Sequence, residues 1–169
     1  MVTGIYAGTF DPITNGHLDI IKRSFSFCDK LIIGIGVNPA KKTLFSEKDR
    51  EKQIATAIYS VYKENDFFKV ANVKVAPFEG LLVEFAKKEK ANILIRGIRS
   101  VSDFEYELTL ANANKILAPG IETVFLPTSP ELAVVSSSLV KEVARYQGDI
   151  SSFVPENVEK ALRSVFAKD

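Results

Sequence analysis

The chain has 169 residues, a length at which one domain can bury a single substantial core. Its 22 Lys and Arg residues are balanced by 21 Asp and Glu residues, and the formal net charge of +1 argues against nucleic-acid binding driven by bulk charge. One cysteine, Cys28, and one histidine, His17, cannot build a disulfide framework or a Cys/His zinc site. No apolar run is long enough to span a bilayer, and the first residues lack the pattern of a signal peptide. We therefore expect a cytoplasmic protein that contacts neither membrane nor nucleic acid.

Short β-branched runs alternate with segments of helical periodicity along the chain. Capping-box spacing at Ser46 and Asp49, and again at Ser102 and Glu105, predicts the starts of two long helices. In chain order, the pattern predicts a strand at 2–8, a helix from Asn15 to about Cys28, a strand at 30–37, a helix from Ser46 to about Lys63, a strand at 69–75, a short helix at 82–86, a strand at 93–96, a helix from Ser102 to about Leu117, a strand at 122–126, a helix that starts at the serines 136–138, and a last helix that begins at Pro155.

Five strands, each followed by a helix, predict an α/β protein: one Rossmann-like domain over residues 1–169, with a five-stranded parallel sheet and helices on both faces. In such folds ligands bind beyond the carboxyl ends of the strands. The loops that reach that edge carry five basic residues and several hydroxyl groups, the basic residues being His17, Lys41, Lys42, Arg96 and Arg99. The sequence therefore predicts a local anion site on a nearly neutral chain.

The loops of the amino-terminal half contribute one strong candidate and several weaker ones. His17 lies in the first turn of a helix, where backbone amides attract phosphate, and the glycine-containing loop before it favours a phosphate role over simple capping. Asp11 precedes a proline at a turn, a position where the carboxylate more often holds its own loop, so we assign it no catalytic role. Lys41 and Lys42 follow the predicted central strand, and either a solvated pair or a phosphate contact from one of them fits that position.

The later loops offer two arginines and three serines. Arg96 and Arg99 leave an apolar strand, and the alternatives are ion pairs with Asp103 or Glu107 or, as we favour, contact with phosphate. Serines 136–138 stand at a predicted helix start, where one of them is expected to act as the cap and where hydroxyls and free amides also suit phosphate.

Several common motifs are missing. The sequence has no GxSxG nucleophile elbow and no GxxxxGK[ST] phosphate loop. A glycine loop of the dinucleotide-binding type is also excluded, because Pro39 stands where its third glycine belongs.

Four motifs in order resemble one family. They are TFDPITNGH at 9–17, LIRGIRS at 94–100, DFEYE at 103–107 and SSSLVKEV at 136–143. The first motif alone is typical of the wider TxGH/HxGH nucleotidyltransferase superfamily. All four together, from about Ile5 to the last helix, resemble phosphopantetheine adenylyltransferase.

The resemblance implies reversible transfer of AMP from ATP to 4'-phosphopantetheine, which yields dephospho-coenzyme A and pyrophosphate with Mg²⁺ held mainly by the ATP phosphates. It also implies a homohexamer of two trimers, with dephospho-coenzyme A and coenzyme A as product or feedback ligand. Thr9 and His17 match the pair that contacts phosphate during transfer. The matching ATP contacts are Thr9, Phe10, His17, Gly97, Ile98, Arg99, Glu107, Leu132, Ala133, Val134, Val135, Ser136, Ser137 and Ser138. The matching phosphopantetheine contacts are Thr9, Lys41, Leu82 and Arg96.

The chain departs from the family pattern at two places. Leu132 stands where family members usually carry an aromatic residue, and the segment from Lys63 to Lys69 is longer than in relatives. Two alternative functions stay open at this point: another enzyme of the superfamily, such as a cytidylyltransferase or a nicotinate mononucleotide adenylyltransferase, and a nucleotide-binding module without catalytic activity.

Overall fold

A computed structural model describes residues 1–40, 42–62 and 72–167. Five parallel strands form one sheet in the order β3-β2-β1-β4-β5. They are β1 (Thr3–Gly8), β2 (Lys30–Gly36), β3 (Val73–Phe78), β4 (Ile93–Ile98) and β5 (Glu122–Pro127). The chain adds strands outward from β1 on one side and then crosses to the other side with β4. This reversal leaves a crevice between the carboxyl ends of β1 and β4, the usual ligand position in such sheets.

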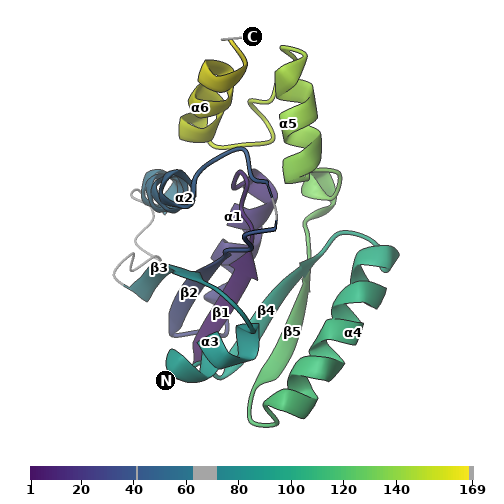
Figure 1. Ribbon diagram of the computed structural model, residues 1–169. Helices are drawn as coiled ribbons and strands as arrows, with labels where there is room; N and C mark the ends of the chain where they lie inside the picture. Colours follow the sequence, from purple (N-terminus) through teal and green to yellow (C-terminus); the bar gives the residue numbers. More distant parts are fainter. Residues whose placement is uncertain (41, 63–71, 168–169) are drawn as a thin grey trace.

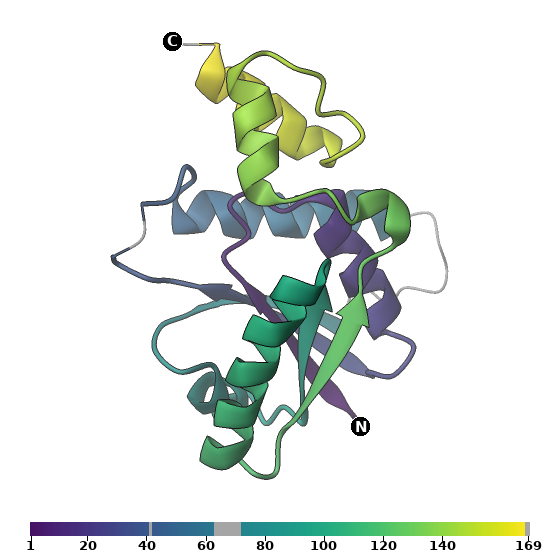
Figure 2. The same ribbon diagram turned by 90° about the vertical axis from the view of Figure 1, so that its right-hand side faces the viewer.

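Helices cover both faces of the sheet (Figure 1). They are α1 (Asn15–Ser24), α2 (Glu47–Tyr62), α3 (Leu82–Lys88), α4 (Val101–Leu117), α5 (Ser137–Arg145) and α6 (Glu156–Phe166). A single turn of 3₁₀ helix at Pro130–Leu132 precedes α5. In Figure 2, α5 and α6 lie beyond the end of the sheet that the arrowheads of β4 and β5 approach. The single α/β domain with a five-stranded parallel sheet is confirmed.

Side chains on neighbouring positions of a strand enter two different cores. Ile32 of β2 packs in the cluster that includes residues of α3, whereas Ile33 packs in the cluster that includes residues of α1, α2, α5 and α6. Because successive side chains of a strand point to opposite faces, a strand covered on both sides must be apolar almost throughout. This explains the run at 30–37 and confirms its prediction as a central strand.

Some element boundaries differ from the sequence prediction. The helix after β1 ends at Ser24 and not at Cys28, because the chain turns at Phe25. The cap of α4 is Ser100, whose side-chain oxygen accepts the Asp103 N–H at 3.2 Å, so the predicted pair of Ser102 and Glu105 is wrong by two residues. The third strand runs from Val73 to Phe78, beyond the predicted end at 75, and residues 69–71, like the long segment from Lys63 to Lys69, lie outside the described residues.

The helix α4 is the least covered element. None of its residues is buried, and large apolar side chains such as Val101, Tyr106, Ile116 and Leu117 are more than half exposed. In the described part of the chain, no helix has both the length and the apolar composition needed to cross a membrane.

Candidate active site

A cavity of about 310 Å³ lies where β1 and β4 end, and we call it the first cavity. Strand β1 contributes Gly8 to its wall, β4 contributes Arg96, and the segments after β1 and β5 close it. Nine of the residues predicted from the sequence line it, namely His17, Arg96, Gly97, Arg99, Glu107, Val135, Ser136, Ser137 and Ser138. The fold therefore gathers residues of all four motifs, from three distant parts of the sequence, around one space.

His17 is held by a reciprocal cap at the start of α1. The Thr14 side-chain oxygen accepts the His17 N–H at 3.4 Å, and the His17 Nδ1 accepts the Thr14 N–H at 2.9 Å. A backbone amide can only donate, so Nδ1 carries no proton and the neutral ring has its proton on Nε2. His17 thus serves as cap and cavity residue at once, and its Nε2–H is a donor available to a ligand.

The surroundings of His17 favour the neutral ring. Burial and, as a smaller cause, the positive charge of Arg99 together lower the pKa of His17 from its ordinary value of 6.5 to about 4. The ring contacts Phe10 edge to face, with the ring centroids 5.0 Å apart, and Tyr6 lies at 6.2 Å. Burial also raises the pKa of Tyr6, so that the hydroxyl stays protonated at neutral pH.

Phe10 owes its position to an uncommon backbone conformation. Its φ of 49° lies in the left-handed region, which is rare for a bulky residue. A Cβ added to Gly8 would lie 3.1 Å from the Phe10 ring, so this glycine makes room for that ring as well as for the predicted ligand. Phe10 is buried and does not line the first cavity with its side chain.

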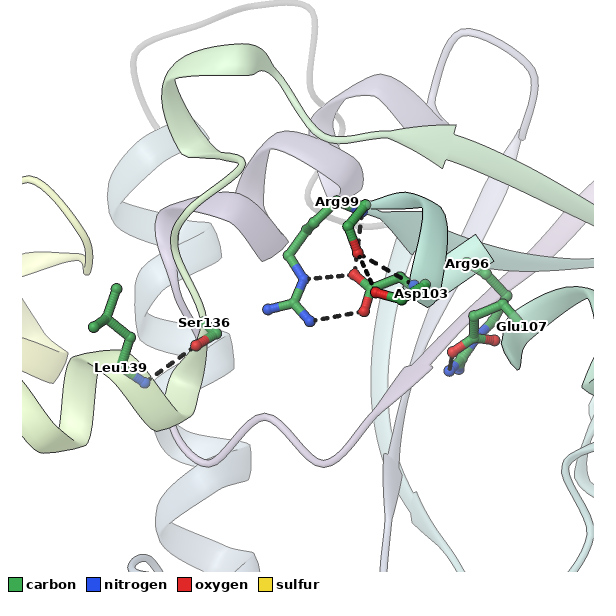
Figure 3. Close-up of polar contacts among 8 residues, drawn as sticks. Arg96, Arg99, Asp103, Glu107, Ser136 and Leu139 are labelled. Atoms are coloured by element: carbon green, nitrogen blue, oxygen red, sulfur yellow. Dashed lines mark hydrogen bonds and ion pairs between the residues drawn. The ribbon is translucent and has the colours of Figure 1, made fainter. Parts of the chain in front are cut away.

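Both arginines of the RGIRS segment are paired with carboxylates of α4. Arg96 donates through Nε and an Nη atom to Glu107 at 2.7 and 2.5 Å, and through its other Nη atom to the Ala7 carbonyl at 2.7 Å. Arg99 donates to both carboxylate oxygens of Asp103 at 2.9 and 3.2 Å. Figure 3 shows the Arg99 guanidinium between the start of α4 and the segment that carries Ser136. The ion pairs weighed as an alternative from the sequence are therefore present.

Among the described residues, the charged side chains that line the first cavity are these two arginines and these two carboxylates, and the charges of these four side chains cancel. The sequence favoured phosphate contact over these ion pairs, and the ion pairs are present because α4 supplies a carboxylate for each arginine. Contact with phosphate stays a prediction. Arg96 commits all three of its nitrogen atoms, whereas no contact within the described ranges is recorded for one Nη of Arg99. Within those ranges Arg99 keeps a whole Nη group for an anion, whereas each Nη group of Arg96 keeps only its second N–H.

The serines divide their tasks. Ser136 caps α5 by accepting the Leu139 N–H at 3.1 Å, as expected for one of the three (Figure 3). Ser137 donates its hydroxyl to the Pro12 carbonyl at 2.8 Å, which ties α5 to the loop before α1. Ser138 lines the cavity and is exposed. The amino end of α5 thus offers backbone amides and hydroxyls to the cavity.

The remaining predicted residues that the structure describes do not line the first cavity. Thr9 lines a second cavity of about 390 Å³, with Thr43 and Arg50 on its wall. Leu82 starts α3 and packs against the core, and Leu132 is half-buried beside the other core. Ile98, Ala133 and Val134 do not line the first cavity, and Val134 is 69% exposed. Lys41 lies outside the described residues.

Sequence reasoning missed the basic residues that contact Thr9 and Asp11. Arg50 is 3% exposed and donates to the Thr9 carbonyl at 2.6 Å. Asp11 is also buried, and its carboxylate contacts Lys141 of α5 at 2.8 Å. Both basic residues lie in charged helical turns that look like solvated faces in the sequence, so no local signal distinguishes them. Among the residues described, no cluster of three or more His, Cys, Asp or Glu side chains could hold a metal ion.

These features define a nucleotidyltransferase, and the model of the cytidylyltransferase-like family matches residues 5–143. Among solved structures, the bifunctional NMN adenylyltransferase/ADP ribose pyrophosphatase from Francisella tularensis has the same fold, with a TM-score of 0.75 at 14% identity over 98% of this chain and 51% of that one.

Curated relatives define the family more narrowly. The phosphopantetheine adenylyltransferase of Alkaliphilus oremlandii is 50% identical over 98% of this chain and 100% of that protein. The one of Caldanaerobacter subterraneus is 48% identical over 99% of each. The chain therefore belongs to the phosphopantetheine adenylyltransferase family.

Proposed function

We propose that the chain catalyses the reaction of its family, the reversible transfer of the adenylyl group from ATP to 4'-phosphopantetheine, which gives dephospho-coenzyme A and pyrophosphate. About 50% identity to named relatives over nearly the full length supports this substrate pair over the acceptors of other superfamily members. The observation that carries the chemistry is the fixed Nε2–H donor of His17 in the first cavity.

The reaction needs alignment and charge stabilisation rather than a protein nucleophile. An oxygen of the acceptor phosphate bonds to the α-phosphorus of ATP, while the bond from that phosphorus to the bridging oxygen breaks and its electron pair leaves with pyrophosphate. The attacking phosphate is already ionised at pH 7, so no general base is required. His17 and Thr9 stabilise the charge that develops on the α-phosphate oxygens.

The other residues divide between the two substrates. Lys41 and Arg96 hold the acceptor phosphate, and Leu82 contacts the rest of the acceptor. Arg99 and serines 136–138 hold the departing pyrophosphate, a role supported by the unengaged Nη of Arg99 beside the amino end of α5. The remaining ATP contacts are Phe10, Gly97, Ile98, Glu107, Leu132, Ala133, Val134 and Val135.

Mg²⁺ is the expected cofactor, bound mainly by the ATP phosphates. The balance of charge in the first cavity supports this, because two paired arginines do not neutralise a triphosphate. When bound, the ion neutralises phosphate charge. No side chain is assigned to it.

We also propose that the protein acts in the cytoplasm as a homohexamer, with dephospho-coenzyme A and coenzyme A as product or feedback ligand. The exposed apolar side chains of α4 support self-association, since an uncovered helix of this kind is unusual on a monomer. Light scattering coupled to size-exclusion chromatography measures the assembly directly.

Pyrophosphate release tests the function. The protein is incubated with ATP and Mg²⁺ and with 4'-phosphopantetheine, pantetheine, nicotinate mononucleotide or no acceptor. We expect release with 4'-phosphopantetheine alone. Release with nicotinate mononucleotide instead would favour the other superfamily enzymes, and ATP binding without release in any mixture would favour a non-catalytic module.

A further inference from the structure

The carboxylate of Asp11 joins three segments that lie far apart in the sequence. Its Oδ1 accepts the Phe45 N–H at 2.9 Å, and its Oδ2 accepts both the Leu44 N–H at 2.9 Å and the Lys141 ammonium at 2.8 Å. The side chain of Asp11 is only 5% exposed, whereas that of Lys141 is 28% exposed. Asp11 therefore does not hold its own loop, as the sequence suggested, but binds that loop to the segment before α2 and to α5.

Helix α5 contacts the same loop a second time. Ser137 and Lys141 are four residues apart on one face of α5, and both reach the Asp11–Pro12 pair. The turn of α5 that presents serines 136–138 to the first cavity is thereby held against the loop that carries Phe10. A shift of α5 along this loop would move the serines relative to His17.

The neighbours of Phe10 are fixed on both sides. Arg50 holds the carbonyl of Thr9, and the buried carboxylate holds position 11. Phe10 between them keeps its left-handed conformation, and its ring lies 5.0 Å from that of His17. A bulky residue keeps such a conformation only where the surrounding structure determines it. Contacts with residues 9 and 11 therefore set the position of the ring beside His17.

The segment before α2 leads to the second cavity. Leu44 and Phe45, which the carboxylate holds, directly follow Thr43, and Thr43 lines that cavity together with Thr9. Asp11 thus joins a segment that carries a wall residue of the second cavity to the helix that carries wall residues of the first cavity.

We propose that Lys141, acting through Asp11, is a positioning residue. It holds His17 and the serines of α5 in fixed positions relative to each other and to the wall of the second cavity. This inference rests on the proposed function. Lys141 does not line the first cavity, so its removal is expected to change the alignment of the reacting groups more than it changes substrate binding. A buried ion pair is a weak source of stability compared with apolar side chains of similar size. This agrees with a role of Lys141 and Asp11 in positioning the active-site residues.

Four variants test the proposal. Lys141→Met and Asp11→Asn each break the pair, the double variant removes both charges, and Lys160→Met is the matched control because it breaks the exposed Lys160–Glu156 pair on α6. We expect kcat to fall by roughly 10- to 100-fold in Lys141→Met, since small misplacements of reacting groups have effects of about this size. The KM values for both substrates should rise by less than kcat falls, and Lys160→Met should match the original protein.

The double variant separates positioning from folding. Without a charge at either position it should melt at a higher temperature than Lys141→Met, in which a buried carboxylate has lost its cation, yet its kcat should stay as low as that of Lys141→Met. The single imidazole signal gives a direct readout: the ring current of Phe10 acts on His17, so this NMR signal should shift in Lys141→Met and stay unchanged in Lys160→Met.

Turnover per folded molecule near that of the original protein in both Lys141→Met and the double variant would overturn the proposal. The proposal would also be overturned if the fold losses of kcat in Lys141→Met and Asp11→Asn multiplied in the double variant. The effects of residues that act as one unit on the free energy of activation are not additive. Failure of the unaltered protein and of Lys160→Met to release pyrophosphate would contradict the proposed function instead.

Discussion

The protonation of His17 gives the sharpest test of the site, because the chain has no other histidine. The perturbation is a fall in pH from 7 to 4. Burial and the charge of Arg99 lower the pKa of His17 to about 4, so the ring should stay neutral in the folded protein over most of this range. In the unfolded chain the same ring becomes protonated near its ordinary pKa of 6.5.

Because the pKa of His17 is lower in the folded protein than in the unfolded chain, acid destabilises the fold. Between pH 6.5 and 4 the unfolded chain binds a proton at residue 17 that the folded protein does not bind, so stability falls as the pH falls. The contribution of the neutral His17 ring to the free energy of unfolding is fully present above about pH 6.5 and is lost as the pH approaches 4. Each pH unit in this window is worth up to about 1.4 kcal/mol, and the whole window roughly 3 kcal/mol.

Two measurements check this prediction. An NMR titration follows the one imidazole, and urea unfolding at several pH values gives the free energy of unfolding for the original protein and for His17→Gln. We expect a midpoint near 4 without ligand, a higher midpoint with ATP bound because phosphate charge favours the imidazolium, and a steeper loss of stability for the original protein than for the variant. A ligand-free midpoint near 6.5 would refute the reasoning, since it would mean that the ring is solvated and not held as a neutral donor.

Three further predictions concern the roles of single residues. His17→Ala should lower kcat by about 100- to 1,000-fold with little change in ATP affinity, whereas loss of the cap alone would cost only about 1 kcal/mol of stability and leave turnover intact; kcat and melting temperature measured on one preparation distinguish the two. Arg96→Ala should weaken binding of 4'-phosphopantetheine more than binding of ATP, and Arg99→Ala should do the reverse; calorimetric titration of each variant with each ligand checks this, and equal losses would show that the arginines are divided wrongly. The kcat/KM for 4'-phosphopantetheine should greatly exceed that for pantetheine, which lacks the anion that Arg96 is proposed to bind, and comparable values would contradict the assignment of the acceptor.

The order and type of the elements could be predicted from the sequence because periodicity and covered faces leave clear patterns. The run at 30–37 is one example, since a strand packed on both faces must be apolar throughout. Helix boundaries were less predictable where two neighbouring residues both suit the N-cap position. Ser100 and Ser102 both suit a helix start, and only the extended backbone at Ser100 decides which one is the cap of α4.

The site could be predicted in part for a similar reason. Loops after parallel strands must meet at one edge, so His17, Arg96 and Arg99 were expected to lie together, and they do. What the sequence does not contain is the partner of each charge. The contacts between Asp11 and Lys141 and between Arg50 and the Thr9 carbonyl join residues 130 and 41 positions apart, and no local spacing predicts them.

The paired arginines bear on why the proposed reaction can run in both directions. A cavity with a large surplus of positive charge would bind pyrophosphate, the small and highly charged product, in preference to the state in which charge is spread over the α-phosphate. In the first cavity, Glu107 and Asp103 already neutralise Arg96 and Arg99, and these contacts also order the guanidinium groups before any substrate arrives. An anion that binds there meets guanidinium groups that are already ordered, but it competes for them with the two carboxylates. Both ATP and pyrophosphate therefore bind less tightly than they would to unpaired arginines. The neutral His17 adds a hydrogen-bond donor whose interaction strengthens as charge moves onto the α-phosphate oxygens. That charge is largest in the transition state, and stabilising the transition state raises the rate in both directions.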